Sequence, residues 1–103
     1  MFHVYVIELD EAVWQNGRFR KANPQRDPAK PCVYVGQTYL TPEERLAQHR
    51  SGKRSNRYVR KFGGKLVREF TGRIRGATRS EAELSERWMA RRLRGMGYWV
   101  WSR

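Results

Sequence analysis

The chain has 103 residues, a length that buries one modest hydrophobic core and predicts a single domain. Lysine and arginine number 22 against 10 aspartates and glutamates, and this net charge of +12 favours a polyanionic partner, nucleic acid before an anionic membrane. Cys32 is the single cysteine, which excludes an internal disulfide and argues against a zinc site built from thiolates, so we interpret it as an apolar strand residue.

The N-terminal third predicts two strands joined by a long loop. The segment "FHVYVIEL" at 2–9 is rich in β-branched and aromatic residues, as strands are. Residues 10–31 contain three of the four prolines and predict a loop, with a small hairpin at Asn16-Gly17. The segment "CVYVG" at 32–36 predicts the second strand. Because the connection has no helical pattern long enough for a parallel crossover, we expect antiparallel pairing.

A strong helix start follows the second strand. Thr41 is a good N-cap, Pro42 suits the first helical position, and Glu44 completes a capping box. We expect this helix to end at Ser51-Gly52.

The rest of the chain predicts alternating short elements. They are a helix at 55–62, a strand at 65–70, a longer helix at 80–94 that begins with a capping box of Ser80 and Glu83, and a last strand or apolar tail at 98–101. This order predicts an α+β fold, a small three-stranded antiparallel sheet flanked by helices.

A carboxylate lies in the middle of the apolar stripe of the 80–94 helix. At about 100° per residue, the positions on the same side as Glu86 are Ala82, Met89, Ala90 and Leu93. Burying Glu86 is costly unless a positive group meets it. The residue therefore pairs with a core-facing arginine, extends to the rim of the core, or binds a metal. Mg²⁺ often takes only one or two protein carboxylates when phosphate supplies other ligands.

Four further side chains are candidates for a site. Arg45 and His49 lie at i and i+4 of one helix, and a guanidinium matches two phosphate oxygens. The alternative for Arg45 is a solvated charge or a partner for Glu44, and the alternative for His49 is an ordinary surface position. Tyr5 and Tyr34 each lie in mid-strand between valines, where packing and function are both open.

Positive charge concentrates between residues 45 and 79, where Glu69 is the only acid. This pattern suits a phosphate backbone and predicts steeply salt-dependent binding. Tyr58 and Phe62 either stack on unpaired bases or form the core side of the short helix. The candidate nucleic-acid contacts are Gly36, Arg50, Lys53, Arg54, Arg57, Arg60 and Lys61.

Taken in order, these segments resemble the GIY-YIG nucleases. "VYV" at 4–6 is similar to the first signature and "YVG" at 34–36 to the second. "QTYLTPEERLAQHRSG" resembles the family's next helix, and "SEAELSER" resembles its metal-binding helix. The resemblance covers nearly all of the chain outside 10–31, which forms an insertion where the family has a short link. No asparagine follows the glutamate helix, where the family often has one.

The resemblance implies a metal-dependent DNA endonuclease that hydrolyses phosphodiester bonds. Glu86 would hold one Mg²⁺ or Mn²⁺, and Arg45 would neutralise charge on the phosphoryl oxygens. Tyr5 would act as general base on the attacking water, while Tyr34 and His49 would orient water or phosphate.

Two other functions stay open: a non-catalytic nucleic-acid-binding module with the same fold, and a basic structural protein bound to a ribonucleoprotein. We expect the insertion to set any DNA preference. Because so small a domain has little surface for sequence readout, we expect a homodimer or a targeting partner protein. We expect no membrane association and a cytoplasmic location, at the nucleoid in a bacterium.

Overall fold

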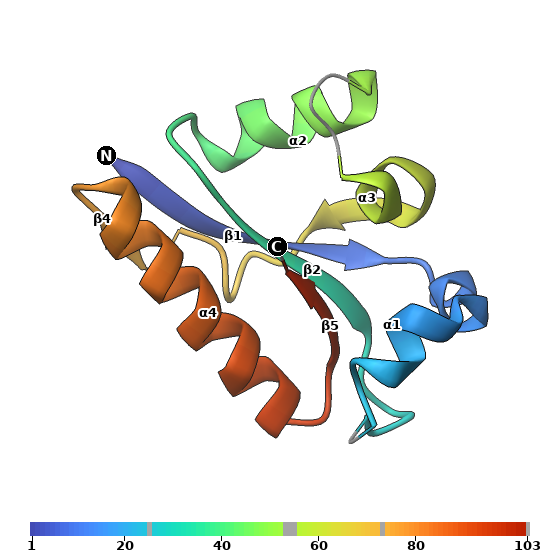
Figure 1. The fold of residues 1–103 in the computed structure, drawn as a ribbon. Helices are drawn as coiled ribbons and strands as arrows, with labels where there is room; N and C mark the ends of the chain where they lie inside the picture. Colours follow the sequence, from blue (N-terminus) through green and yellow to red (C-terminus); the bar gives the residue numbers. More distant parts are fainter. Residues whose placement is uncertain (25, 53–55, 73, 103) are drawn as a thin grey trace.

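The computed structural model describes residues 1–24, 26–52, 56–72 and 74–102 (Figure 1). Its elements are, in chain order, β1 (Phe2–Leu9), the 3₁₀ helix η1 (Glu11–Gln15), α1 (Gly17–Lys21), β2 (Cys32–Thr38), α2 (Pro42–Ser51), α3 (Arg57–Phe62), β3 (Gly63–Leu66), β4 (Arg75–Gly76), α4 (Arg79–Gly95) and β5 (Trp99–Ser102).

In the described part of the chain, five strands form one mixed sheet with the order β3-β1-β2-β5, and β4 pairs with the start of β1. The predicted α+β class and the antiparallel pairing of β1 with β2 are confirmed. The predicted three-stranded antiparallel sheet is wrong, because β5 adds to β2 in parallel. Helix α4 carries the chain back along the sheet, so β5 starts at the same end as β2 (Figure 1).

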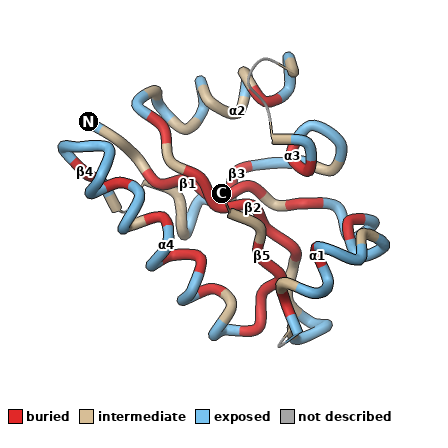
Figure 2. The backbone as a smooth tube through the Cα atoms, viewed as in Figure 1, coloured by how far each residue is buried: buried red, intermediate tan, exposed pale blue. Residues whose placement is uncertain are grey.

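Helices cover both faces of the sheet, with α4 on one side and α1, α2 and α3 on the other (Figure 1). Side chains alternate between the faces. Val4 and Val6 pack with α4 residues such as Leu93, whereas Tyr5 and Ile7 pack in the cluster beneath α2 and α3. Buried positions follow the central strands and the sheet-facing side of α4 (Figure 2).

The two predicted capping boxes have different outcomes. Thr41 and Glu44 form the expected box at the start of α2, and Gly52 ends that helix with a positive φ of 81°. Helix α4 instead begins with Thr78 and Glu81, two residues before the predicted start at Ser80. The pairs Thr78/Glu81 and Ser80/Glu83 have the same spacing. The helix begins at the earlier pair because each residue added to the helix contributes another backbone hydrogen bond.

Two other predicted elements differ in extent. Strand β2 extends to Thr38, two residues past its predicted end. The strand predicted at 65–70 is β3 at Gly63–Leu66, after which the chain turns with a bond from the Phe70 amide to the Val67 carbonyl.

The insertion, residues 10–31, is a folded part of the core. The hairpin predicted at Asn16-Gly17 is wrong, because Asn16 caps α1 by accepting a hydrogen bond from the Phe19 amide. Val13 and Phe19 are fully buried in the cluster that also contains Tyr58 and Trp99. The insertion therefore contributes to folding as well as to surface.

Asn23 fastens the insertion to the edge strand β5. Its side-chain oxygen accepts from the Val100 amide at 2.7 Å, and its amide nitrogen donates to the Val100 carbonyl at 3.0 Å and to the Phe19 carbonyl at 2.8 Å. One buried side chain thus satisfies the backbone groups that a neighbouring strand would otherwise pair.

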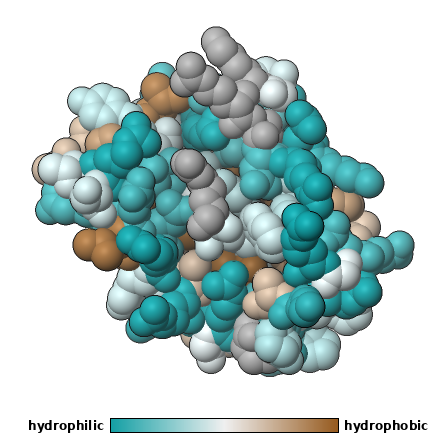
Figure 3. Space-filling model, in the orientation of Figure 1, coloured by the Kyte–Doolittle hydropathy of each residue, from teal (hydrophilic) through white to brown (hydrophobic). Residues whose placement is uncertain are grey.

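The described residues contain no helix that is long and apolar enough to cross a membrane. The face seen in Figure 3 consists largely of hydrophilic residues with a few separate hydrophobic ones. This agrees with the high content of charged residues.

We expect Asn23→Ala to lower the free energy of unfolding by about 2–4 kcal/mol, because it leaves buried backbone groups of β5 and α1 without partners. Urea denaturation measures this. Lys21→Ala, at an exposed position of the same insertion, is the control and should change stability by less than about 0.5 kcal/mol. Equal effects of the two substitutions would contradict the role assigned to Asn23.

Candidate active site

The register of β1 against β2 places Tyr5 directly opposite Gly36. A Cβ atom at Gly36 would lie 2.6 Å from the Tyr5 hydroxyl oxygen and 2.9 Å from a ring carbon of Tyr34. Glycine is therefore required sterically, because both aromatic rings lie across this backbone position. Gly36 is one of the nucleic-acid contacts predicted from the sequence. In the structure it is buried beneath the two tyrosines.

His49 joins these tyrosines from α2. Its Nε2 lies 2.9 Å from the Tyr5 hydroxyl oxygen, and its ring centroid lies 5.9 Å from that of Tyr5 and 5.8 Å from that of Tyr34. The capping box at Thr41 sets the start of α2, and Leu46 packs the helix on the core, so the imidazole points at the sheet. All three rings are buried.

The environment keeps Tyr5 and His49 neutral. Burial raises the pKa of the Tyr5 phenol well above its ordinary value; the electrostatic effect of Tyr34 adds to this and that of Glu86 adds a smaller increase. Burial, with the positive charge of Arg45, lowers the pKa of His49 to about 4. At neutral pH a protonated phenol therefore faces a neutral imidazole, and the tautomer of His49 sets which of the two donates the hydrogen bond.

Arg45 brings positive charge to the same place. Its charge and a side-chain hydrogen bond with Tyr5 both lower the pKa of that phenol, against the effect of burial. The Arg45 guanidinium also donates to the Gln48 side-chain oxygen at 2.9 Å. Arg45 is only partly buried, so its guanidinium can bind an anion at the surface next to the buried rings. We call Tyr5, Tyr34, Arg45 and His49 the tyrosine cluster.

Glu86 lies on the other face of the sheet. As the apolar stripe predicts, it is buried on α4 with Met89, Ala90 and Leu93, at 5% exposure. It lines a small pocket of about 170 Å³ with three other side chains, Gln37, Glu83 and Arg87, which we call the α4 pocket.

The two sites are neighbours along β2. Gly36 touches the tyrosine cluster, and the next residue, Gln37, lines the α4 pocket on the opposite face. In the described part of the chain, β5 pairs with Cys32 to Val35, and β2 continues beyond that pairing. Glu86 also acts on Tyr5 electrostatically, since its charge raises the pKa of that phenol.

The donors of the α4 pocket suit a hard divalent cation. Glu83 and Glu86 are one helical turn apart, and the side-chain oxygen of Gln37 is buried with no hydrogen-bond partner among the described residues. Carboxylate and amide oxygens are the ligands that Mg²⁺ and Mn²⁺ prefer. No group of three or more His, Cys, Asp or Glu side chains in the described ranges could hold a metal, so water and phosphate would complete the shell.

The predicted basic contacts lie mostly on α2 and α3. Arg50 donates to the Gly64 carbonyl at 3.1 Å, and Arg57, Arg60 and Lys61 are exposed on α3. Lys53 and Arg54 lie outside the described residues. The core-side interpretation of Tyr58 is confirmed, since it is buried.

The sequence interpretation missed Gln37, Glu83 and Arg87. Two signals were available: Gln37 directly follows the "YVG" segment, and Glu83 and Arg87 flank Glu86 on its helix. Which side chains share a pocket with Glu86 depends on how α4 docks on the sheet.

No family model, no curated protein and no solved structure matches the chain.

We expect Gly36→Ala to destabilise the protein by about 1–3 kcal/mol and to displace the Tyr5 ring, because the new methyl group overlaps the phenol. Denaturant unfolding measures the loss. Gly95→Ala is the matched control, since a Cβ there meets nothing within 4 Å, and it should leave stability unchanged or slightly higher. If the two variants are equally stable, the close packing at Gly36 is not needed.

The lowered pKa of His49 makes stability depend on pH. Between its ordinary value of 6.5 and about 4, the unfolded chain binds a proton that the folded chain does not, so stability falls as pH falls through this range. The contribution approaches about 1.4 kcal/mol per pH unit. Unfolding titrations of the wild type and His49→Gln should diverge in slope here. Parallel curves would show that His49 titrates normally.

Proposed function

We propose that the protein is a divalent-metal-dependent DNA endonuclease of the GIY-YIG type. The observation that carries the proposal is the contact between Tyr5 and His49 beside Arg45. One residue along β2 is a pocket that combines two carboxylates, an amide and a guanidinium. A base, a phosphate-binding cation and a metal site are the groups that phosphodiester hydrolysis requires. The net charge of +12 supports a nucleic-acid substrate.

The residues divide the chemistry as follows. The guanidinium of Arg45 binds a non-bridging phosphate oxygen and stabilises the charge that develops there. Glu86, with Gln37 and Glu83, would hold Mg²⁺ or Mn²⁺, which polarises the scissile phosphate and stabilises the leaving oxygen. Tyr5 takes a proton from the attacking water, and Tyr34 holds the Tyr5 ring in place from the neighbouring strand.

Proton transfer through Tyr5 depends on its two polar neighbours. A phenol with a raised pKa keeps its proton in the free protein, so it needs a proton acceptor and nearby positive charge to act as a base. His49 supplies the acceptor at Nε2, and Arg45 supplies the charge. Because Tyr5 is only 1% exposed, DNA binding must also open a path from its hydroxyl to water.

The same burial favours a second candidate function, a non-catalytic DNA-binding module that keeps the fold. In that case Tyr5 and His49 hold α2 on the sheet, and Arg45 contributes only charge. Tight, salt-sensitive binding without metal-dependent cleavage would distinguish it.

We expect the purified protein to cleave plasmid and branched DNA with Mg²⁺ or Mn²⁺ and to be inactive in a chelator. Glu86→Gln and Arg45→Ala should each reduce the cleavage rate by about 10²–10³-fold, as the loss of one transition-state contact does. Gel-based single-turnover rates measure this.

Arg91→Gln is the control, because it removes a positive charge at an exposed position of α4 and should cleave like the wild type. Absence of cleavage by the wild type, or equal rates in Glu86→Gln and the wild type, would overturn the endonuclease proposal. The mutant comparison also excludes a contaminating nuclease.

A further inference from the structure

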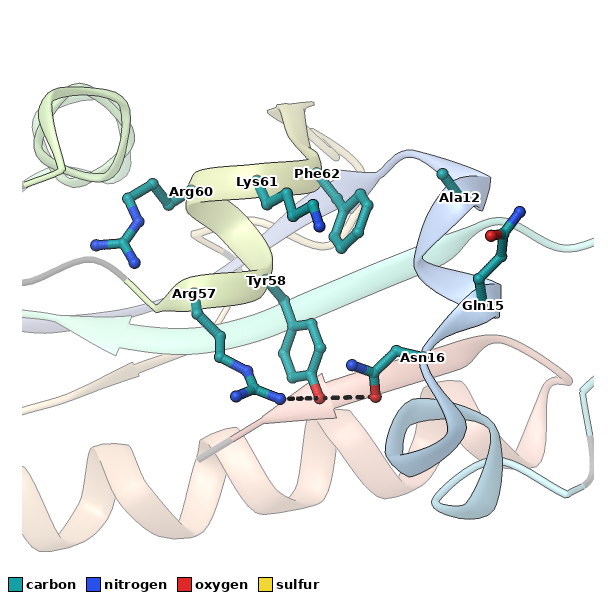
Figure 4. A pocket seen from close by; sticks show the side chains of 8 residues that line it. All are labelled: Ala12, Gln15, Asn16, Arg57, Tyr58, Arg60, Lys61 and Phe62. Carbon is teal, nitrogen blue, oxygen red and sulfur yellow. Dashed lines mark hydrogen bonds between the residues drawn. The ribbon is translucent and has the colours of Figure 1, made fainter.

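A second cleft lies away from the tyrosine cluster, between the insertion and α3. It has a volume of about 800 Å³, and its lining residues are Ala12, Gln15, Asn16, Arg57, Tyr58, Arg60, Lys61 and Phe62 (Figure 4). Hydrogen bonds tie its two walls together at both ends. The Asp10 amide donates to the Phe62 carbonyl at 2.8 Å, and the Tyr58 hydroxyl donates to the Asn16 side-chain oxygen at 3.2 Å. We call it the α3 cleft.

The walls of the α3 cleft are anchored in the core. Phe19 of the insertion is fully buried, and its ring packs edge-on against Tyr58 with centroids 5.6 Å apart. The Tyr58 ring also packs against the Trp101 ring, with centroids 4.7 Å apart. The two walls therefore hold their separation, and the cleft is preformed.

The polar lining of the α3 cleft suits an anion. Arg57 lies with its guanidinium 5.1 Å from the centre of the Tyr58 ring, and the Lys61 ammonium lies 5.3 Å from that of Phe62. Asn16 already accepts hydrogen bonds from Phe19 and Tyr58 through its oxygen, so it offers the cleft an N–H donor. None of the described lining residues is acidic.

The cations continue toward α2. In Figure 4, Arg60 points away from the insertion, whereas Lys61 lies beside Phe62 above the Tyr58 ring. A neighbouring cleft of about 720 Å³ shares Ala12, Lys61 and Phe62 with the α3 cleft. It adds the cations Arg50 of α2 and Lys65, and also the acidic Glu8 and Asp10 of the opposite wall. The tyrosine cluster and the α3 cleft lie on the same face of the sheet, because Tyr5 and Tyr58 belong to one core cluster.

The size of the α3 cleft decides which form of nucleic acid fits. Its volume matches sites that hold a small ligand, about one or two nucleotides, and is too small to admit a duplex. A single strand presents both phosphates and flexible backbone to such a groove. We propose that the α3 cleft binds the phosphates of an unpaired DNA strand, and that the substrate is therefore DNA in which a single strand branches from a duplex. This inference rests on the proposed function, because it takes DNA as the substrate.

The test is equilibrium binding by fluorescence anisotropy in a chelator, so that no cleavage occurs. The probes are a short oligothymidine, a duplex with a single-stranded flap, and the same duplex without the flap. We expect the full chain to bind the first two more tightly than the third. The double variant Arg57→Gln/Lys61→Gln should lose about tenfold or more on oligothymidine, with a salt slope shallower by about 1.4.

Asn16→Asp is the sharper variant. Aspartate keeps both acceptor contacts of the oxygen, to Phe19 and Tyr58, and remains a good N-cap, so folding is preserved while a negative charge enters the cleft. It should weaken binding to oligothymidine and to the flap severalfold and leave binding to the plain duplex nearly unchanged. Arg91→Gln, the control for lost charge, should affect all three probes slightly and alike.

Equal losses on the flap and the plain duplex in these variants, or a wild type that binds the plain duplex as tightly as the flap, would overturn the α3 cleft as a single-strand site. The endonuclease proposal is judged separately by cleavage. Flap preference without cleavage would leave the cleft standing and remove the enzyme, and cleavage without flap preference would do the reverse.

Discussion

The pairing of Tyr5 with Gly36 is the constraint on which the rest of the candidate active site depends. In this register a residue without a side chain lies under the Tyr5 hydroxyl and beside Tyr34, which leaves room for both rings on one face of the sheet. His49 can then approach to hydrogen-bond distance from α2. A slip of one residue would turn Tyr5 to the α4 face and separate it from His49 and Arg45.

The geometry divides the proposed chemistry between two faces of a single strand. Neutral, buried rings and Arg45 gather under α2, whereas the carboxylates gather at α4. The two faces are still coupled electrostatically, because the charge of Glu86 raises the pKa of Tyr5. A phosphate bound at this strand end would meet Arg45 from one side and the α4 pocket from the other. In the proposed reaction, the substrate and cation would complete the electrostatic environment that lowers the raised pKa of Tyr5.

The insertion gives this small domain surface that its sheet and helices alone would lack. Asn23 attaches it to the free edge of β5, and Phe19 anchors it in the core beside Tyr58. The same anchoring that protects an edge strand also builds one wall of the α3 cleft. If the α3 cleft selects the substrate as proposed, stability and substrate choice are coupled in these residues. Removing the insertion would then alter both preference and folding.

The sequence by itself determined the features with a local cause: strand β1, the start of α2 at Thr41, and the buried position of Glu86, since each follows from periodicity or capping. The tertiary structure alone decided the parallel docking of β5, the folding of the insertion around Asn23 and Phe19, and the choice of Gln37 as a neighbour of Glu86. These depend on contacts between residues far apart in the chain. No local pattern encodes such contacts, because they form only when packing of the whole core offsets the entropy of closing the loops between them.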